Sequence, residues 1–237
     1  MKDIILLILK ELPQCFRNFG RLLMAPKRFL RDRNRYSEAR LTQALTFAGV
    51  SFALYSIILA LSVPVGTDFL TRTASHALLT LTLTLLFGAE VVLAWRIVGG
   101  RARFGRHWIT YLYQQAGFLL IFVVCLLIFF GLLEFLLPDV SHVARNMIMR
   151  GGKDEAGAFR IALQAAITAQ QEPQLLAIAA WDVLTVLTPW TWFYLSWGAY
   201  REIHGLSRAR SFGAGVIYLV FFIVSLPIAL LISIGVG

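Results

Sequence analysis

Two carboxylates, Glu90 and Asp182, stand inside long apolar stretches of this 237-residue sequence. An ionisable side chain in a membrane helix is costly unless it is paired, so each one is a candidate functional group. Asp182 also begins a polar stripe, because Thr185, Pro189 and Ser196 follow on the same face of a helix. Two interpretations fit this pattern: an ion or proton site in a polar cavity, or carboxylates that hydrogen-bond neighbouring helices and fix their packing.

Other residue types that carry chemistry show no useful pattern. The four histidines each stand alone near the end of an apolar stretch: His76, His107, His142 and His204. This spacing does not match a zinc site. Cys15 and Cys125 lie in different surroundings, which excludes a disulfide framework or a cysteine metal site. Since P-loop, dinucleotide and serine-hydrolase motifs are also missing from the sequence, we expect no enzyme activity, no catalytic residue, no metal and no cofactor.

The composition places these residues in a membrane protein. The chain is 58% apolar and 15% charged, whereas soluble domains average about 45–50% and about 25%. Its mean hydropathy is +0.72. The net charge of +9 would suggest nucleic acid as a partner of a soluble protein, but here it indicates basic loops against anionic lipid head groups.

Five apolar stretches are long enough to cross about 30 Å of hydrocarbon as helices. They are Thr42–Val63, His76–Val98, Gly117–Leu137, Leu175–Ala199 and Ala214–Val236. We therefore predict an all-α polytopic membrane protein in which a basic segment, 1–41, precedes a five-span domain, 42–237. One long loop, 138–174, lies outside the bundle.

The basic residues predict the orientation. The N-terminal segment and the connections after the second and fourth spans carry 17 Lys and Arg residues, against 5 on the other side. By the positive-inside rule the N-terminus is cytoplasmic, and five spans then place the C-terminus outside.

Within the N-terminal segment, Phe16–Met24 alternates apolar and basic residues at helical spacing. This pattern favours a helix in the membrane interface with its apolar side on lipid and its arginines on phosphates, over a solvated basic arm. The candidate head-group contacts are Arg17, Arg21, Lys27, Arg28, Arg101, Arg103, Arg106, Arg208 and Arg210.

Four segments carry a family resemblance. They are Met-Ala-Pro-Lys-Arg-Phe at 24–29, Val-Gly-Gly-Arg-Ala-Arg-Phe at 98–104, Trp-Asp-Val-Leu-Thr at 181–185, and Trp-Gly-Ala-Tyr-Arg-Glu-Ile-His-Gly-Leu-Ser-Arg-Ala-Arg-Ser at 197–211. In this order they resemble the Yip1 family of five-span membrane proteins. The short loops resemble bacterial inner-membrane members, which largely lack an assigned activity. The Rab-type GTPase partners of eukaryotic members are therefore not carried over.

Two classes of function follow. The first is a non-enzymatic scaffold or adaptor whose basic cytoplasmic face engages lipid head groups, a membrane-protein partner or a second copy of the chain. The alternative is a small transporter or channel subunit that uses Asp182 and Glu90 in a polar intramembrane path. A nucleic-acid partner is not expected.

Overall fold

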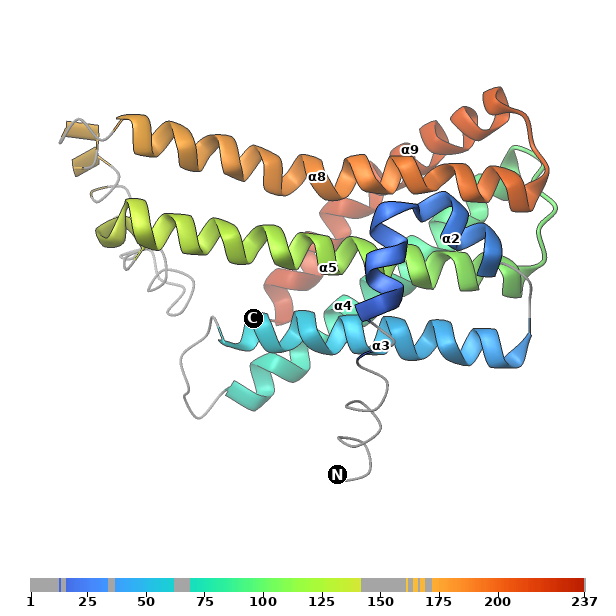
Figure 1. Ribbon diagram of the computed structural model, residues 1–237, viewed down its shortest axis with the longest axis horizontal. Coiled ribbons are helices and arrows are strands. Elements are labelled where there is room, and N and C mark those ends of the chain that lie inside the picture. The colour runs from blue at the N-terminus through green and yellow to red at the C-terminus, as the bar shows by residue number, and fades with distance from the viewer. Residues whose placement is uncertain are drawn as a thin grey trace.

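The computed structural model describes residues 16–33, 37–61, 69–141 and 172–236, with isolated positions at 13 and within 161–168, and these residues form helices and their connections only. The main helices are α2 (Pro26–Arg33), α3 (Glu38–Leu61), α4 (Phe69–Ile97), α5 (Phe104–Leu136), α8 (Glu172–His204) and α9 (Arg208–Val236) (Figure 1). The all-helical part of the predicted fold class is confirmed for this part of the chain.

Among the described residues, four helices are long and apolar enough to cross a membrane: Ala77–Ile97 of α4, Phe104–Leu136 of α5, Pro173–His204 of α8 and Arg208–Ser225 of α9. Helices suit this role because they satisfy their own backbone hydrogen bonds. The first predicted span, 42–63, largely coincides with α3, which is not among the four. The count of five spans therefore stays a prediction. Most of the predicted outer loop, including all of 142–160, lies outside the described residues.

The third span begins earlier than the hydropathy predicts. α5 begins at Phe104, thirteen residues before Gly117, and its 33 residues measure about 50 Å. A bilayer has about 30 Å of hydrocarbon, so about 20 Å of α5 extends beyond it. The hydropathy misses this extension because it carries polar side chains, such as His107 and Gln114, that the protein itself buries.

The helices form two groups. α5 packs between α3 and α8 in a front layer, and α4 pairs with α9 behind it (Figure 1). The turn from α4 to α5 and the turn from α8 to α9 lie at the same end of the bundle, on the right in Figure 1. We call this the basic end, because its turns and first helical residues carry Arg101, Arg103, Arg106, Arg208 and Arg210.

Two clusters of buried side chains hold the helices together toward the basic end. The first joins the N-terminal segment to α3, α5 and α8 through Leu22, Phe29, Leu30, Phe47, Ile109, Tyr113 and Trp192. The second joins α4, α5, α8 and α9 through Val91, Trp95, Tyr111, Phe193, Trp197, Tyr200 and Tyr218. A smaller cluster of Leu133, Leu137 and Val140 lies toward the other end.

The N-terminal segment is helical over residues 16–24 and continues into α2 after a break at Ala25. We call residues 16–33 the basic collar. Its apolar residues Leu22, Phe29 and Leu30 are at most 4% exposed and pack on the bundle. The apolar side of this segment was predicted to lie on lipid, but protein covers these three side chains. The first turns of α5 and the C-terminal part of α8 provide the apolar surface on which they pack.

A second set of apolar side chains in the basic collar is not covered by the described protein. Met24 is 91% exposed, Phe16 is 59% exposed and Leu23 is 37% exposed. These three side chains are the part of the collar that can still contact lipid in the way the interfacial prediction requires.

Candidate functional site

The candidate carboxylates Glu90 and Asp182 do not meet. The Trp181 indole donates to the Cys125 carbonyl at 3.1 Å, which places Asp182 beside that part of α5. Glu90 instead interacts electrostatically with Tyr111. Since Tyr111 and Cys125 are fourteen residues apart on one helix, about 21 Å separates the two levels. Glu90 lies toward the basic end and Asp182 toward the opposite end.

Asp182 is exposed, and among the described residues it makes no hydrogen bond or ion pair. The other members of the predicted stripe, Thr185, Pro189 and Ser196, are buried. Thr185 donates to the Trp181 carbonyl of its own helix at 2.9 Å, and α8 continues through Pro189. The stripe therefore exists without the carboxylate that was expected to begin it, because Asp182 lies on the edge of that face.

Ser196 is the stripe residue that links two helices. It accepts a hydrogen bond from Gln114 Nε2 of α5, and it donates to the Phe193 carbonyl at 2.7 Å. Gln114 is fully buried and also donates to the Phe193 carbonyl at 3.3 Å. These bonds fix α5 against α8, which supports the packing interpretation for this part of the stripe.

Glu90 is buried on α4, where its carboxyl interacts with the Ser225 hydroxyl of α9. Its Oε2 has no partner among the described residues. Nearby, the Tyr111 hydroxyl donates to the Thr84 carbonyl of α4 at 2.6 Å. Glu90 therefore lies in a small group of polar atoms between α4, α5 and α9.

The prediction that each histidine stands alone is wrong for two of them, because His107 and His204 form a pair. His107 Nδ1 and His204 Nε2 are 3.1 Å apart and both residues are buried. The Ala102 N–H donates to His204 Nδ1 at 3.2 Å, so neutral His204 carries its proton on Nε2 and donates it to His107. The pair therefore joins the start of α5 to the end of α8 through the turn after α4.

The backbone around this histidine pair leaves no space for a larger residue. Gly99 has a φ of +91°, and the Gly100 N–H donates to the Trp95 carbonyl at 2.8 Å. A Cβ at Gly100 would collide with His204 Nδ1 and with the Trp95 carbonyl oxygen. The Trp95 indole stacks on the His204 ring with centroids 5.0 Å apart. The sequence gives no signal for this pair, since His107 and His204 are 97 residues apart.

The predicted head-group contacts lie on several segments: Figure 1 shows the two turns at the basic end, α2 toward that end, and the first collar helix nearer the middle of the bundle. Among these contacts, Arg106 is half-buried. The other eight are exposed: Arg17, Arg21, Lys27, Arg28, Arg101, Arg103, Arg208 and Arg210. The positive charge is therefore presented outward, while the apolar collar residues Leu22, Phe29 and Leu30 face the bundle.

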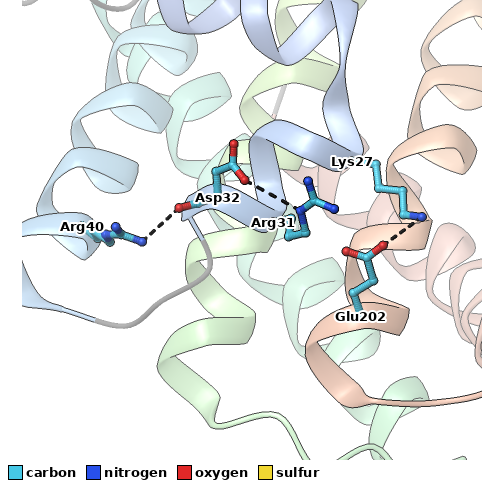
Figure 2. Close-up of polar contacts among 5 residues, drawn as sticks. All are labelled: Lys27, Arg31, Asp32, Arg40 and Glu202. Carbon is cyan, nitrogen blue, oxygen red and sulfur yellow. Dashed lines mark hydrogen bonds and ion pairs between the residues drawn. The ribbon is translucent and has the colours of Figure 1, made fainter.

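Polar contacts fasten the basic collar to the bundle. Lys27 Nζ lies 2.9 Å from Glu202 Oε1 of α8, as Figure 2 shows. Glu202 is the acidic residue of the last turn of α8, so the pair ties α2 to the basic end. Among the described residues, no three His, Cys, Asp or Glu side chains gather in a group that could hold a metal ion.

In comparisons with known proteins, no family model, no curated protein and no solved structure matches this chain. The Yip1 resemblance therefore stays a prediction from the sequence.

Proposed function

We propose that this chain is a Yip1-like membrane protein of a bacterial inner membrane, with five spans, a cytoplasmic N-terminus and an external C-terminus. It acts as a non-enzymatic scaffold or adaptor whose basic end engages anionic lipid head groups or a partner protein. Four long apolar helices support the membrane assignment. The distribution of 17 basic residues against 5 supports the orientation.

The docking of the basic collar is the observation that carries this proposal. Leu22, Phe29 and Leu30 are buried, and burial of such side chains is worth about 1.5–3 kcal/mol each. This packing holds the exposed cations Arg21 and Arg28 on the folded bundle, and the contact between Lys27 and Glu202 brings α2 toward the end that carries the arginine-rich turns. A folded, positively charged surface of this kind attracts anionic lipid, with each basic residue contributing about 1 kcal/mol near the membrane.

The lipid interaction can be tested with the full chain in nanodiscs of phosphatidylcholine, with or without phosphatidylglycerol. We expect a higher Tm in the anionic discs and a smaller difference at high salt, because salt screens exposed charges. Changing Arg28, Arg103 and Arg208 to Gln should reduce the difference, and changing the same residues to Lys should preserve it. An equal Tm in both lipids for the unaltered protein would contradict the proposal.

The partner and the orientation need separate measurements. A protein that co-purifies in mild detergent with the unaltered chain and the Lys variant, but not with the Gln variant, would be a partner of the basic end. A reporter fused after Gly237 should be active only on the extracytoplasmic side. Activity in the cytoplasm would overturn the five-span topology.

The transporter alternative has less support. A polar path used by both Glu90 and Asp182 needs side chains that face a common space, but they lie at different levels and Asp182 is exposed. Substitution of each carboxylate by its amide tests this alternative, since loss of ion flux in vesicles with unchanged Tm would favour transport.

A further inference from the structure

A polar cavity of about 270 Å³ lies where the basic collar meets the beginnings of α3 and α5. Three arginines from different segments line it: Arg21 from the first collar helix, Arg33 from the end of α2 and Arg40 from the start of α3. Asp32 contributes the one carboxylate of the lining. Three guanidinium groups against one carboxylate leave a net charge of +2.

Arg33 is held in place before any ligand arrives. Its Nη1 donates to the Tyr113 hydroxyl at 3.1 Å, and its Nη2 donates to Asn18 Oδ1 at 2.9 Å. Its Cζ lies 4.6 Å from the centre of the Phe29 ring. Ordering a long side chain on binding costs about 0.5–1.5 kcal/mol. Because Arg33 is already ordered in the folded protein, a ligand that binds it avoids this cost. Arg33 is thus a preorganised binding group.

The carboxylate of Asp32 has a partner that does not itself line the cavity. It lies 3.7 Å from Nε of Arg31, which does not line the cavity, while Arg40 Nη1 donates to the Asp32 backbone carbonyl at 3.1 Å (Figure 2). Both members of the Arg31 pair are about half exposed, so the pair is weak, but it orients the carboxylate. The lining therefore keeps its positive character.

The predicted boundaries of the spans place the cavity at the level of lipid phosphates. Tyr113 lines it and precedes Gly117, where the apolar part of α5 begins, by about one helical turn, or roughly 6 Å. Arg40 lies two residues before the first predicted span. Both positions correspond to the boundary between hydrocarbon and water, where the polar head-group region of a bilayer begins.

Charge and size indicate the chemistry of the occupant. Guanidinium groups bind phosphate oxygens through paired N–H donors. A phosphate monoester carries a charge of about −1.5 to −2 near pH 7, which matches the lining better than the single charge of a phosphodiester. A volume of about 270 Å³ is slightly below the roughly 300 Å³ at which pockets for drug-sized molecules begin. A phosphate with a short glycerol-sized substituent therefore fits the cavity better than a nucleotide.

We propose that this cavity binds a phosphate monoester through Arg21, Arg33 and Arg40. The monoester is carried either by a lipid, as in phosphatidic acid, or by a soluble molecule, as in glycerol 3-phosphate. This inference rests on the proposed function only in taking the basic end as the head-group surface.

The test uses the full chain in detergent, titrated with short-chain phosphatidic acid, short-chain phosphatidylglycerol and glycerol 3-phosphate. We expect phosphatidic acid to bind at least about tenfold more tightly than phosphatidylglycerol, the phosphodiester. The double variant Arg21→Gln with Arg40→Gln should weaken that binding at least about tenfold, because charge-assisted hydrogen bonds are lost. The control, Arg72→Gln with Arg201→Gln, removes the same charge at residues that neither line the cavity nor belong to the candidate head-group contacts, and it should change the affinity less than about threefold.

A second variant protects the test against misfolding of the double variant. Asp32→Asn removes the carboxylate of the lining at an exposed position, so it should strengthen monoester binding severalfold. Weaker binding by Asp32→Asn, equal binding of phosphatidylglycerol, or an equal loss in the control variant would overturn the proposal. If glycerol 3-phosphate competes with phosphatidic acid, the proposal is supported and the ligand can be a soluble molecule. If phosphatidic acid binds and glycerol 3-phosphate does not, the proposal is supported and the ligand is a lipid.

Failure of this inference and failure of the proposed function give different results. If anionic nanodiscs raise the Tm but no probe prefers the monoester, the cavity proposal fails and the lipid-binding scaffold stands. If glycerol 3-phosphate binds through Arg21 and Arg40 while the nanodisc composition has no effect, the cavity proposal stands and the lipid-binding scaffold fails.

Discussion

The two parts of α5 differ in how their side chains are covered: the first buries polar residues in the protein, and the second leaves many apolar residues uncovered. Between Phe104 and Ala116 the helix places polar residues such as His107 and Gln114 inside the protein, at 0–1% exposure. Between 117 and 136 its side chains are almost all apolar, and many remain uncovered, with Phe135 at 83% exposure.

This difference indicates where the stability of the molecule resides. Apolar side chains in a bilayer gain little from moving between lipid and protein, so helices there associate through close packing and interhelical hydrogen bonds rather than through the hydrophobic effect. Beyond the bilayer, burial in protein is strongly favourable. The part of the bundle near the basic end, where the aromatic cluster and the collar lie, should therefore respond much more strongly to substitution than the other part.

Loss of a buried indole should have the largest effect. Trp95 is fully buried and contacts His204, Tyr200 and Trp197. Trp95→Ala should destabilise the protein by about 3–5 kcal/mol, because it leaves a large cavity. Phe135→Ala is the matched control, and we expect a change below about 0.5 kcal/mol. Equal losses of Tm in detergent for both variants would contradict the proposed difference between the two parts.

Two glycines in the second part of α5 compare a closely packed position at its beginning with an uncovered position farther along, through an added methyl group. A Cβ at Gly117 would lie 2.5 Å from the Trp192 ring, whereas a Cβ at Gly131 has nothing within 4 Å. Gly117→Ala should cost about 1–3 kcal/mol through overpacking. Gly131→Ala should be neutral or stabilising by up to about 1 kcal/mol, because alanine favours a helix. The measurement is thermal unfolding of the two variants in one detergent, and a destabilised Gly131→Ala would contradict the expectation.

The sequence predicted the apolar helices better than it predicted the site. Hydropathy located α4, α8 and α9 well, since lipid-facing residues must be apolar. It missed the first thirteen residues of α5 because their polar side chains are buried by neighbours that are distant in sequence. The histidine pair was missed for the same reason.

The charge pattern predicted one feature of the candidate site and missed another. It identified basic residues that, apart from half-buried Arg106, the structure leaves exposed. Arg33 and Arg40 were not among the candidate contacts, although they line the cavity. Only the folding of the collar onto α3 and α5 brings these two arginines together with Arg21, and that contact leaves no local pattern in the sequence.

Within the basic part, the ion pair between the collar and α8 should contribute little. The side chains of Lys27 and Glu202 are 45% and 28% exposed, so water and salt screen their attraction. A double-mutant cycle with Lys27→Met and Glu202→Gln should give a coupling energy below about 1 kcal/mol that falls as salt is added. A coupling energy well above this would mean that the ion pair, rather than Leu22, Phe29 and Leu30, holds the collar in place.

Substitution of Asp182 should give the smallest change in stability, although a carboxylate in a membrane helix is expected to be paired and therefore important for packing. A buried carboxylate would leave a donor without a partner when it is replaced by leucine, at a cost of about 1–3 kcal/mol. The structure shows an exposed side chain with no such donor among the described residues.

Both Asp182→Asn and Asp182→Leu should therefore leave the Tm nearly unchanged, and the leucine variant should be the more stable of the two in a bilayer, because an exposed carboxylate there is unfavourable. Thermal unfolding in nanodiscs checks the order of the two variants. A loss of about 1–3 kcal/mol for Asp182→Leu would reveal a donor that satisfies the carboxylate. If Asp182→Asn unfolds normally but abolishes a cellular phenotype, the carboxylate charge itself is required, and the transporter alternative replaces the scaffold.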